Sequence, residues 1–358
     1  MTRIYNFSPG PSVLPLPVLE RAQKDLLDWP GAGHSVMEMS HRSKWFETII
    51  GDAREKLRTL MNIPANYSIL FLQGGASLQF AMVPYNLMPA GGCADYVDSG
   101  SFASKALEEG LRLGDARAIA SSKQDGYAYV PQVDFAKLSP GAAYLHITTN
   151  NTIFGTRWPA IPDSPVPLVA DMSSNIMGEV YDVSKFALIY AGAQKNIGPA
   201  GLTVVIIRED MIGHARPGTP TMLDYRTHDK SDSLYNTPCC WAIYVAGLVF
   251  DWLLEQGGVP AIEEVNRQKA ALLYDVIDNS SLYTGVARPD CRSLMNVTFT
   301  LPTQELTAAF VNDAKNRGLI SLKGHRSAGG IRASIYNAMP VEGVQALAQF
   351  MKDFEAAN

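Results

Sequence analysis

Short apolar runs alternate with stretches of helical periodicity over the first two-thirds of the sequence, and this alternation constrains the fold strongly. The strand-like runs are SILFLQ, DYVDSGS, AYLHITT, PLVADMS, ALIYAGA and LTVVIIR. Helical spacing follows several of them, as in LQFAMVPYNLM and FASKALEEGLRLG. Strands with intervening helices favour an α/β fold whose sheet is mainly parallel and covered on both faces.

The last two of these runs are joined differently from the others. Only about seven residues, KNIGPAG, separate ALIYAGAQ from LTVVIIR, whereas a parallel crossover needs a dozen or more. We therefore expect these two segments to be antiparallel to each other, or not adjacent at all. This Gly-rich connection also contains Lys195, a residue type that is seldom buried.

The pattern changes near Gly258, where helix, strand, helix, strand and helix follow over roughly 100 residues. Because 358 residues exceed a typical single domain, we expect two domains. The larger, a mainly parallel α/β domain, is predicted to span residues 16–257. The smaller, an α+β domain, is predicted to combine residues 1–15 with residues 258–358. A cleft between two domains is a favoured place for a ligand.

Composition excludes some functions. The formal charge of −5 argues against a general nucleic-acid or anionic-membrane surface. Four cysteines without C-x-x-C spacing, and a start that lacks a signal-peptide pattern, favour a reduced, cytoplasmic protein. The longest apolar run, CCWAIYVAGLVF, has 12 residues and predicts a buried helix, because it is too short to span a bilayer. No clustered metal ligands are evident, so no catalytic metal is expected.

Two residues suggest covalent cofactor chemistry. Partial desolvation would lower the pKa of Lys195, and its free amine could form an imine with a carbonyl. Asp171 ends the apolar segment PLVAD, where a carboxylate is costly unless paired; it could pair with the protonated ring nitrogen of pyridoxal phosphate. The ordinary alternatives are a surface turn lysine and a helix-capping aspartate.

The sequence also contains candidate contacts for the phosphate and for the aromatic ring of such a cofactor. GGAS, residues 74–77, joins a strand to a helix, and N–H groups at a helix start attract phosphate, although Ser77 could simply cap the helix. Phe102 could lie flat on a pyridine ring, and Thr152 offers a hydroxyl near a strand end.

Basic residues form two further groups. His41 and Arg42 lie in MSHRS, and His325, Arg326 and Arg332 lie in KGHRSAGGIRAS. Each pair alone is more typical of an exposed loop. Together, in Gly-flanked loops, they favour a substrate with two anionic groups, because guanidinium matches carboxylate and phosphate oxygens.

The order of the segments NFSPGPSVLP, MEMSHRS, GGAS, DMSSN, YAGAQKNIGPAGLTVV, SLYNTP and LKGHRSAGGIRASIYNAMP closely resembles the phosphoserine aminotransferase family. The resemblance covers essentially the whole chain, and it implies a fold-type I, class V aminotransferase that uses pyridoxal 5'-phosphate. The blocks around Lys195 and Arg332 are long and specific, whereas GGAS alone is not.

The resemblance also implies roles for residues. Lys195 would bind the cofactor covalently and move the proton, with Gln194 beside it, and Asp171 would pair with the ring nitrogen. The other implied contacts are Ala76, Ser77, Phe102 and Thr152 to the cofactor, Asn236 and Thr237 to the cofactor phosphate of the neighbouring subunit, Arg332 to the substrate α-carboxylate, and His41, Arg42, His325 and Arg326 to the substrate phosphate. Some of the last four would come from the partner chain, which implies a homodimer with shared active sites.

The implied reaction is reversible amino transfer between L-glutamate and 3-phosphohydroxypyruvate, giving O-phospho-L-serine and 2-oxoglutarate. A related phosphorylated four-carbon acid of pyridoxine synthesis is a further plausible substrate. Phe102 stands where many family members have tryptophan, and Pro9 stands where several have serine or alanine.

Two other classes remain as alternatives. Cysteine desulfurases share the fold class and need a mobile nucleophilic cysteine, for which only Cys239 and Cys240 are candidates. A non-catalytic protein that binds a phosphorylated metabolite is the second, although such a binder needs no imine-forming lysine. A Rossmann dehydrogenase is excluded because no G-x-G-x-x-G follows the first strand.

Overall fold

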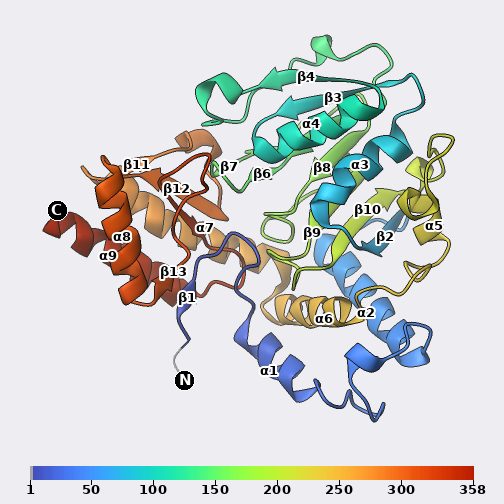
Figure 1. Cartoon of the computed structure of the whole chain (residues 1–358), viewed down its shortest axis with the longest axis horizontal. Helices are drawn as coiled ribbons and strands as arrows, with labels where there is room; N and C mark the ends of the chain where they lie inside the picture. The colour runs from blue at the N-terminus through green and yellow to red at the C-terminus, as the bar shows by residue number, and fades with distance from the viewer. Residues whose placement is uncertain (1–2) are drawn as a thin grey trace.

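A large twisted sheet forms the centre of the molecule in the computed structural model, which describes residues 3–358 (Figure 1). Within these residues the sheet has seven strands. In order across the sheet they are β2 (Tyr67–Leu72), β10 (Thr203–Arg208), β9 (Leu188–Gly192), β8 (Leu168–Asp171), β5 (Leu145–Thr148), β3 (Cys93–Asp98) and β4 (Asp115–Ser121). All neighbours are parallel except that β10 is antiparallel to both β2 and β9. The antiparallel alternative for the two closely joined segments is confirmed.

Helices cover both faces of this sheet, as the alternating pattern predicts. They are α1 (Leu16–Lys24), α2 (Lys44–Met61), α3 (Gly75–Leu87), α4 (Ser101–Leu113), α5 (Tyr225–Asp229) and α6 (Cys240–Glu255). Residues alternate between faces along each strand, so Val204 and Ile206 pack toward α2 and α6 while Val205 and Ile207 pack toward α3. The helix predicted from the longest apolar run is α6, whose central residues are buried.

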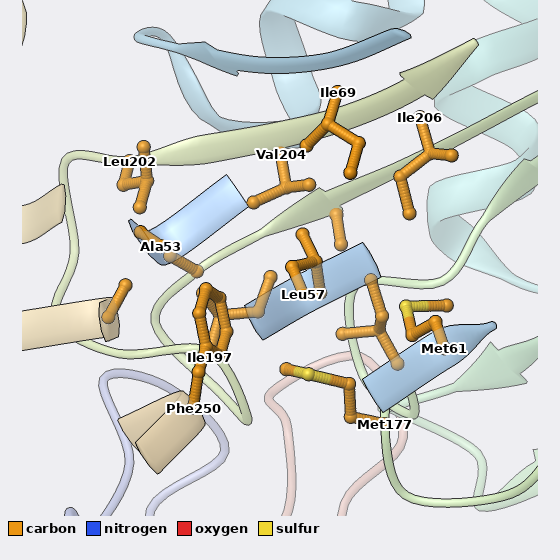
Figure 2. Packing of buried hydrophobic residues seen from close by; sticks show 14 of the residues in the cluster. Ala53, Leu57, Met61, Ile69, Met177, Ile197, Leu202, Val204, Ile206 and Phe250 are labelled. Atoms are coloured by element: carbon orange, nitrogen blue, oxygen red, sulfur yellow. The ribbon is translucent and has the colours of Figure 1, made fainter. Parts of the chain in front are cut away.

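Figure 2 shows the core on the α2 and α6 side of the sheet. Leu57 of α2 and Phe250 of α6, both fully buried, pack with Val204 of β10. Ile197 and Leu202, from the connection between β9 and β10, belong to the same cluster. The core therefore anchors the connection that contains Lys195.

The C-terminal part of the chain builds a separate core and, within the described residues, a second sheet of three strands, in which one of its four strands takes no part. Its elements are α7 (Gly258–Asp278), β11 (Thr284–Gly285), β12 (Asn296–Thr300), α8 (Gln304–Asn316), β13 (Leu319–Ile320), β14 (Ile331–Ser334) and α9 (Val341–Ala357). The N-terminal strand β1 (Tyr5–Asn6) pairs in parallel with β13, and Phe7 is buried among C-terminal side chains. A short hairpin of β6 (Asn150–Asn151) and β7 (Thr156–Arg157) lies between the two sheets in Figure 1. In residues 3–358, no helix is long and apolar enough to cross a membrane.

Candidate active site

The connection between β9 and β10, residues 193–202, holds Lys195 in a tight turn. The N–H groups of Lys195 and Gly198 both donate to the carbonyl of Ala193, at 2.8 Å each. Gly198 lies against α6, because a Cβ added there would approach Ala246 Cα to 3.3 Å. On the other side, the Ser12 hydroxyl donates to the Lys195 carbonyl at 2.6 Å. The turn is thus fixed on two sides, and Lys195 lies on the wall of a cavity.

This cavity has a volume of about 260 Å³ and lies at the carboxyl ends of β5, β8 and β9. The carboxyl edge of a parallel sheet is where ligands of open α/β folds bind. The sequence-predicted residues that line it are Ala76, Ser77, Phe102, Thr152, Asp171, Gln194, Lys195, His325 and Arg332. Residues that are far apart in the sequence therefore meet at one place.

The Lys195 amine donates to the Thr152 hydroxyl at 2.7 Å. The pKa of this amine is lowered to about 8, chiefly by burial; the nearby Asp171 carboxylate opposes the fall, and the Arg332 charge contributes to it. The Phe102 ring centroid lies 5.6 Å from the same nitrogen. A lysine with a lowered pKa has a larger fraction of free, nucleophilic amine near neutral pH.

Asp171 is the last residue of β8, and its carboxylate is buried. Burial raises the pKa of this carboxyl, and contact with Ser173 opposes the rise; the Ser173 N–H donates to Oδ1 at 2.9 Å. Alternation along β8 puts Asp171 on the same sheet face as Val169, the face covered by α3. The carboxylate is available to a positively charged partner within the cavity.

The N-terminus of α3 forms another wall. Gly74 and Gly75 have positive φ angles of +95° and +65°, which lets the chain turn sharply from β2 into the helix. Gly75, Ala76 and Ser77 line the cavity, and a Cβ added at Gly75 would meet no heavy atom within 4 Å. Free N–H groups beside open space at a helix start form a suitable site for an anion.

Two basic residues come from the C-terminal part of the chain. Arg332, in β14, is only 7% exposed, and burial lowers the pKa of its guanidinium. His325 lies on the loop before β14; burial and the nearby charges of Arg332, Arg326 and Lys105 lower the pKa of its imidazole. Arg332 therefore gives the cavity wall a cation and His325 adds an imidazole, as recognition of an anionic substrate requires.

Five predicted residues do not line the cavity in the described part of the chain: His41, Arg42, Asn236, Thr237 and Arg326. Arg326 is one residue from the wall but exposed. Asn236 donates to the side chain of Gln73, two residues before α3 begins, at 3.1 Å. Cys239 and Cys240, the desulfurase candidates, are also absent from the wall, and burial raises the pKa of the Cys240 thiol.

Several cavity residues were not predicted, among them Thr148, Asn150 and Ser174. Thr148 ends β5 and pairs with Asp171, so its strand-end position could have indicated it. Asn150 donates to Ser174 at 2.8 Å and to Asn296 of β12 at 2.9 Å, and it accepts from the Ser293 hydroxyl. These bonds join the cavity wall to the C-terminal part of the chain.

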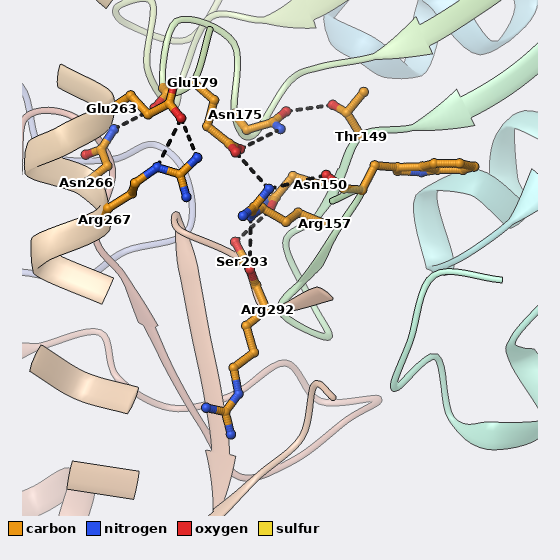
Figure 3. A network of polar contacts seen from close by, with 12 residues as sticks. Thr149, Asn150, Arg157, Asn175, Glu179, Glu263, Asn266, Arg267, Arg292 and Ser293 are labelled. Carbon is orange, nitrogen blue, oxygen red and sulfur yellow. Dashed lines mark hydrogen bonds and ion pairs between the residues drawn. The ribbon is translucent and has the colours of Figure 1, made fainter. Parts of the chain in front are cut away.

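Figure 3 shows how this polar network continues away from the cavity. Arg157 forms a largely buried ion pair with Glu179 at 2.9 Å and donates to the Arg292 carbonyl. Asn175 accepts from the Thr149 hydroxyl at 2.6 Å. Since Asn175 and Glu179 follow Asp171 closely in sequence, the network fixes the segment beyond the Asp171 carboxylate.

The cavity fits pyridoxal phosphate by its chemistry. It combines a lysine amine, a buried carboxylate, an aromatic ring and an open helix N-terminus. Within residues 3–358, Thr148 Oγ1 and Arg332 Nε are buried without a hydrogen-bond partner, and both residues line the cavity. In the same residues, no group of three or more His, Cys, Asp or Glu side chains could hold a metal ion. Fold and site define the class of fold-type I enzymes that depend on pyridoxal phosphate.

Comparison with known proteins names the family. The model of aminotransferase class-V matches residues 4–347, so the chain belongs to the class-V aminotransferases. It is 58% identical to the phosphoserine aminotransferase of Bacillus cereus, with 100% of both chains covered, and 58% identical to that of Geobacillus kaustophilus, with 99% of both covered. This membership confirms the sequence predictions of an aminotransferase fold and of pyridoxal phosphate as cofactor.

Solved structures agree. The phosphoserine aminotransferase of Bacillus circulans subsp. alkalophilus superposes with a TM-score of 0.96 at 48% identity, with 99% of each chain covered. The structure described as pyridoxal-phosphate-bound phosphoserine aminotransferase from Trichomonas vaginalis gives a TM-score of 0.94 at 41% identity, covering 98% of this chain and 100% of that one.

Proposed function

We propose that this chain is a phosphoserine aminotransferase, which transfers an amino group reversibly between L-glutamate and 3-phosphohydroxypyruvate to give O-phospho-L-serine and 2-oxoglutarate. The observation that carries the proposal is the arrangement of the cavity, where Lys195 and Asp171 face the same space as Arg332 and His325. Full-length relatives with this name at 58% identity support the same substrate class. The product would serve the synthesis of L-serine.

The residues that would hold the cofactor follow from their chemistry. The N–H groups of Gly75, Ala76 and Ser77 would bind its phosphate, Asp171 its ring nitrogen and Phe102 one face of its ring. Pyridoxal phosphate, when bound, supplies a carbonyl that condenses with amines and a ring that accepts the electron pair left behind by a departing α-proton. Asp171 would keep the ring nitrogen protonated, because a buried carboxylate is costly unless a positively charged group pairs with it.

The chain's own residues then bind the substrate and move the proton. Arg332 takes the α-carboxylate, and two of its guanidinium N–H groups fix the direction of the Cα–H bond. Lys195 Nζ accepts the α-proton and returns it, which its lowered pKa permits near neutral pH. Thr152, which accepts from Nζ at 2.7 Å, orients the free amine between these transfers.

We further propose a homodimer with shared active sites, in the cytoplasm. His41, Arg42, Asn236 and Thr237 lie outside the cavity of their own chain, which supports their contribution to the partner's site. All four cysteines are unpaired, in agreement with a reducing compartment. We also propose the division into residues 16–257 and residues 1–15 with 258–358; the separate C-terminal core that includes Phe7 supports it.

The decisive measurement is the visible absorption spectrum of the purified protein and of Lys195→Ala, before and after O-phospho-L-serine is added. We expect the wild-type band of the bound cofactor to convert to the amine form, and the variant to show no cycle. A band that responds to other amino acids but not to phosphoserine would overturn the substrate assignment alone. Release of sulfide from cysteine would favour a desulfurase, and a bound cofactor that no amino donor converts would favour a non-catalytic binder.

A further inference from the structure

Lys269, on α7, is buried and has no part in the proposed reaction. Its side chain is fully inaccessible to solvent (0% exposed). The ammonium donates to three backbone carbonyls, those of Ile335 at 2.9 Å, Tyr336 at 2.8 Å and Met339 at 3.1 Å. An ammonium has three N–H donors. Lys269 therefore uses all of them on one short segment, residues 335–339.

Burial of a charged lysine costs free energy of desolvation, and an apolar residue that only filled the space would avoid this cost. None of the ion pairs within residues 3–358 includes Lys269. Burial lowers the pKa of its ammonium to about 7. A methionine of similar length would fill the volume without this desolvation, but it would offer no donor to the three carbonyls. The distinctive contribution of the lysine is its hold on the three carbonyls.

The segment that Lys269 holds reaches the active site at two points. The N–H of Asn337 donates to Asn196 Oδ1 at 3.1 Å, and Asn196 directly follows Lys195. The Tyr336 hydroxyl donates to the carbonyl of Pro9 at 2.8 Å, and Pro9 lines the cavity. One bond joins the segment to the residue after Lys195, and the other joins it to the cavity wall.

The same segment continues directly from β14, which contains Arg332 and ends at Ser334. Asn266, one helical turn before Lys269 on α7, donates to the side chain of Asn337 at 2.8 Å and to the carbonyl of Gly178 at 3.0 Å. Figure 3 shows Asn266 beside the polar network that fixes the segment after Asp171. Thus α7 ties the Arg332 strand to the large sheet.

We infer that Lys269 is a positioning residue: it holds residues 335–339 against the Lys195 connection and so sets where Arg332 lies relative to Lys195. The inference rests on the proposed function, in which Arg332 binds the α-carboxylate of the amino-acid substrate. Because glutamate and phosphoserine share this carboxylate, a displaced Arg332 weakens the binding of both by the same factor. Loss of a residue that binds the substrate phosphate would not act equally on both.

The kinetic test compares Lys269→Met with Lys352→Met, a matched removal of an exposed lysine from α9. We expect Lys269→Met to raise KM for glutamate and for phosphoserine by about tenfold each, with a smaller change in kcat, because misplacement of a binding group is costly. Lys352→Met should leave both constants unchanged. A Lys269→Met protein with a lower melting temperature but unchanged KM values would have lost only stability, and that result would overturn the inference.

Hydrogen exchange of the cofactor-free chain provides a second test that needs no activity. We expect the backbone N–H of Asn337, and the peptide that contains it, to exchange faster in Lys269→Met than in wild type or Lys352→Met. If Lys269→Met does not fold, Lys269→Gln serves instead; its amide retains two donors for three carbonyls, so we expect a smaller but still measurable increase in exchange. Exchange equal to that of wild type in the folded variant would overturn the inference.

The two tests also separate this inference from the proposed function. If wild-type protein does not convert phosphoserine, the substrate assignment fails, while faster exchange around Asn337 in Lys269→Met still supports positioning by Lys269. A third variant, Asn196→Ala, removes the acceptor of the Asn337 N–H. Its effect on exchange should not add to that of Lys269→Met, because the two residues act through one segment. If the effects of the two substitutions on exchange add fully, the two residues do not act through the same segment, and the inference is contradicted.

Discussion

Single residues around the cavity differ in how strongly the chain fixes them, and Arg326 is among the least constrained. It is exposed next to His325, whereas Arg332 is buried. If Arg326 binds the substrate phosphate, Arg326→Ala removes charged hydrogen bonds of roughly 1.5–3 kcal/mol in total. We expect KM for phosphoserine to rise about 10- to 100-fold, with a smaller rise for glutamate, whose side-chain carboxylate carries less charge.

The control for Arg326→Ala is Arg112→Ala, which removes an exposed arginine from α4. The visible spectrum of the bound cofactor should stay the same in both variants, because neither residue lines the cavity. An unchanged KM for phosphoserine in Arg326→Ala would show that Arg326 has no role in phosphate binding.

The Lys195 amine provides a prediction of pH dependence. Burial lowers its pKa from 10.5 to about 8, so the free amine becomes the major form as pH rises through about 8. We expect the rate at which pyridoxal phosphate attaches to the cofactor-free chain to increase with a midpoint near pH 8. Stopped-flow absorbance between pH 6.5 and about 10.5 would measure it. A rate that continues to climb steeply above pH 9.5 would mean that Lys195 titrates as an ordinary surface lysine.

At the residue scale, the sequence contains local signals for some site residues and none for others. Lys195 and Asp171 could be predicted because a charged side chain at the end of an apolar strand is costly unless it is paired or has a function. Asn150 and Ser174 could not be separated from ordinary polar residues, because their importance depends on which segments are neighbours. Lys269 is a plain lysine in a helical pattern, and only the structure shows that it is buried.

Among the elements, α3 is the one whose start determines the cofactor site. Gly74 has φ +95°, and a Cβ there would lie 2.6 Å from Leu78 Cβ; Gly75 has φ +65° and free space around it. An L-residue in the left-handed region costs about 1–2 kcal/mol, and overpacking typically adds about 1–3. We expect Gly74→Ala to lower the free energy of unfolding of the cofactor-free chain by about 2–5 kcal/mol, and Gly75→Ala by about 1–2.

Urea unfolding of the two variants, followed by circular dichroism, checks this pair. The comparison is internal, because both substitutions add one methyl group to adjacent glycines with positive φ. Equal losses of stability would mean that the Leu78 side chain does not restrict the turn before α3.

Periodicity was sufficient for most elements, and the exceptions have physical reasons. The strand β4, DARAIAS, was not predicted; it lies at the sheet edge and is largely exposed, so its apolar alternation is weak. The helix α2 was also not predicted, although Phe46, Ile49, Ile50 and Leu57 recur at helical spacing and Ser43 caps its start. The short β1 and β13 depend on pairing with each other, which no local pattern reveals.

At the scale of the whole molecule, the site of one chain lacks several of its predicted parts. The sequence resemblance assigns substrate and cofactor contacts to Arg42 and Thr237, yet neither lines the cavity of its own chain. Periodicity could not have shown this, because it carries no information on which copy of a residue reaches a site. A two-fold dimer that exchanges such residues would complete both cavities at once.

Mixing two inactive variants tests this exchange. Lys195→Ala inactivates the site of its own chain but can still contribute Arg42 to its partner. Arg42→Ala retains Lys195 in its own site but cannot contribute Arg42 to its partner. In a mixed dimer, the cavity of the Arg42→Ala chain would then receive Arg42 from the Lys195→Ala chain and be intact. After unfolding and refolding an equimolar mixture, about half of the dimers should be mixed, each with one good site of two, so we expect about a quarter of wild-type activity. If Arg42 instead serves its own chain, each cavity of a mixed dimer has one defect, and the mixture is no more active than its components.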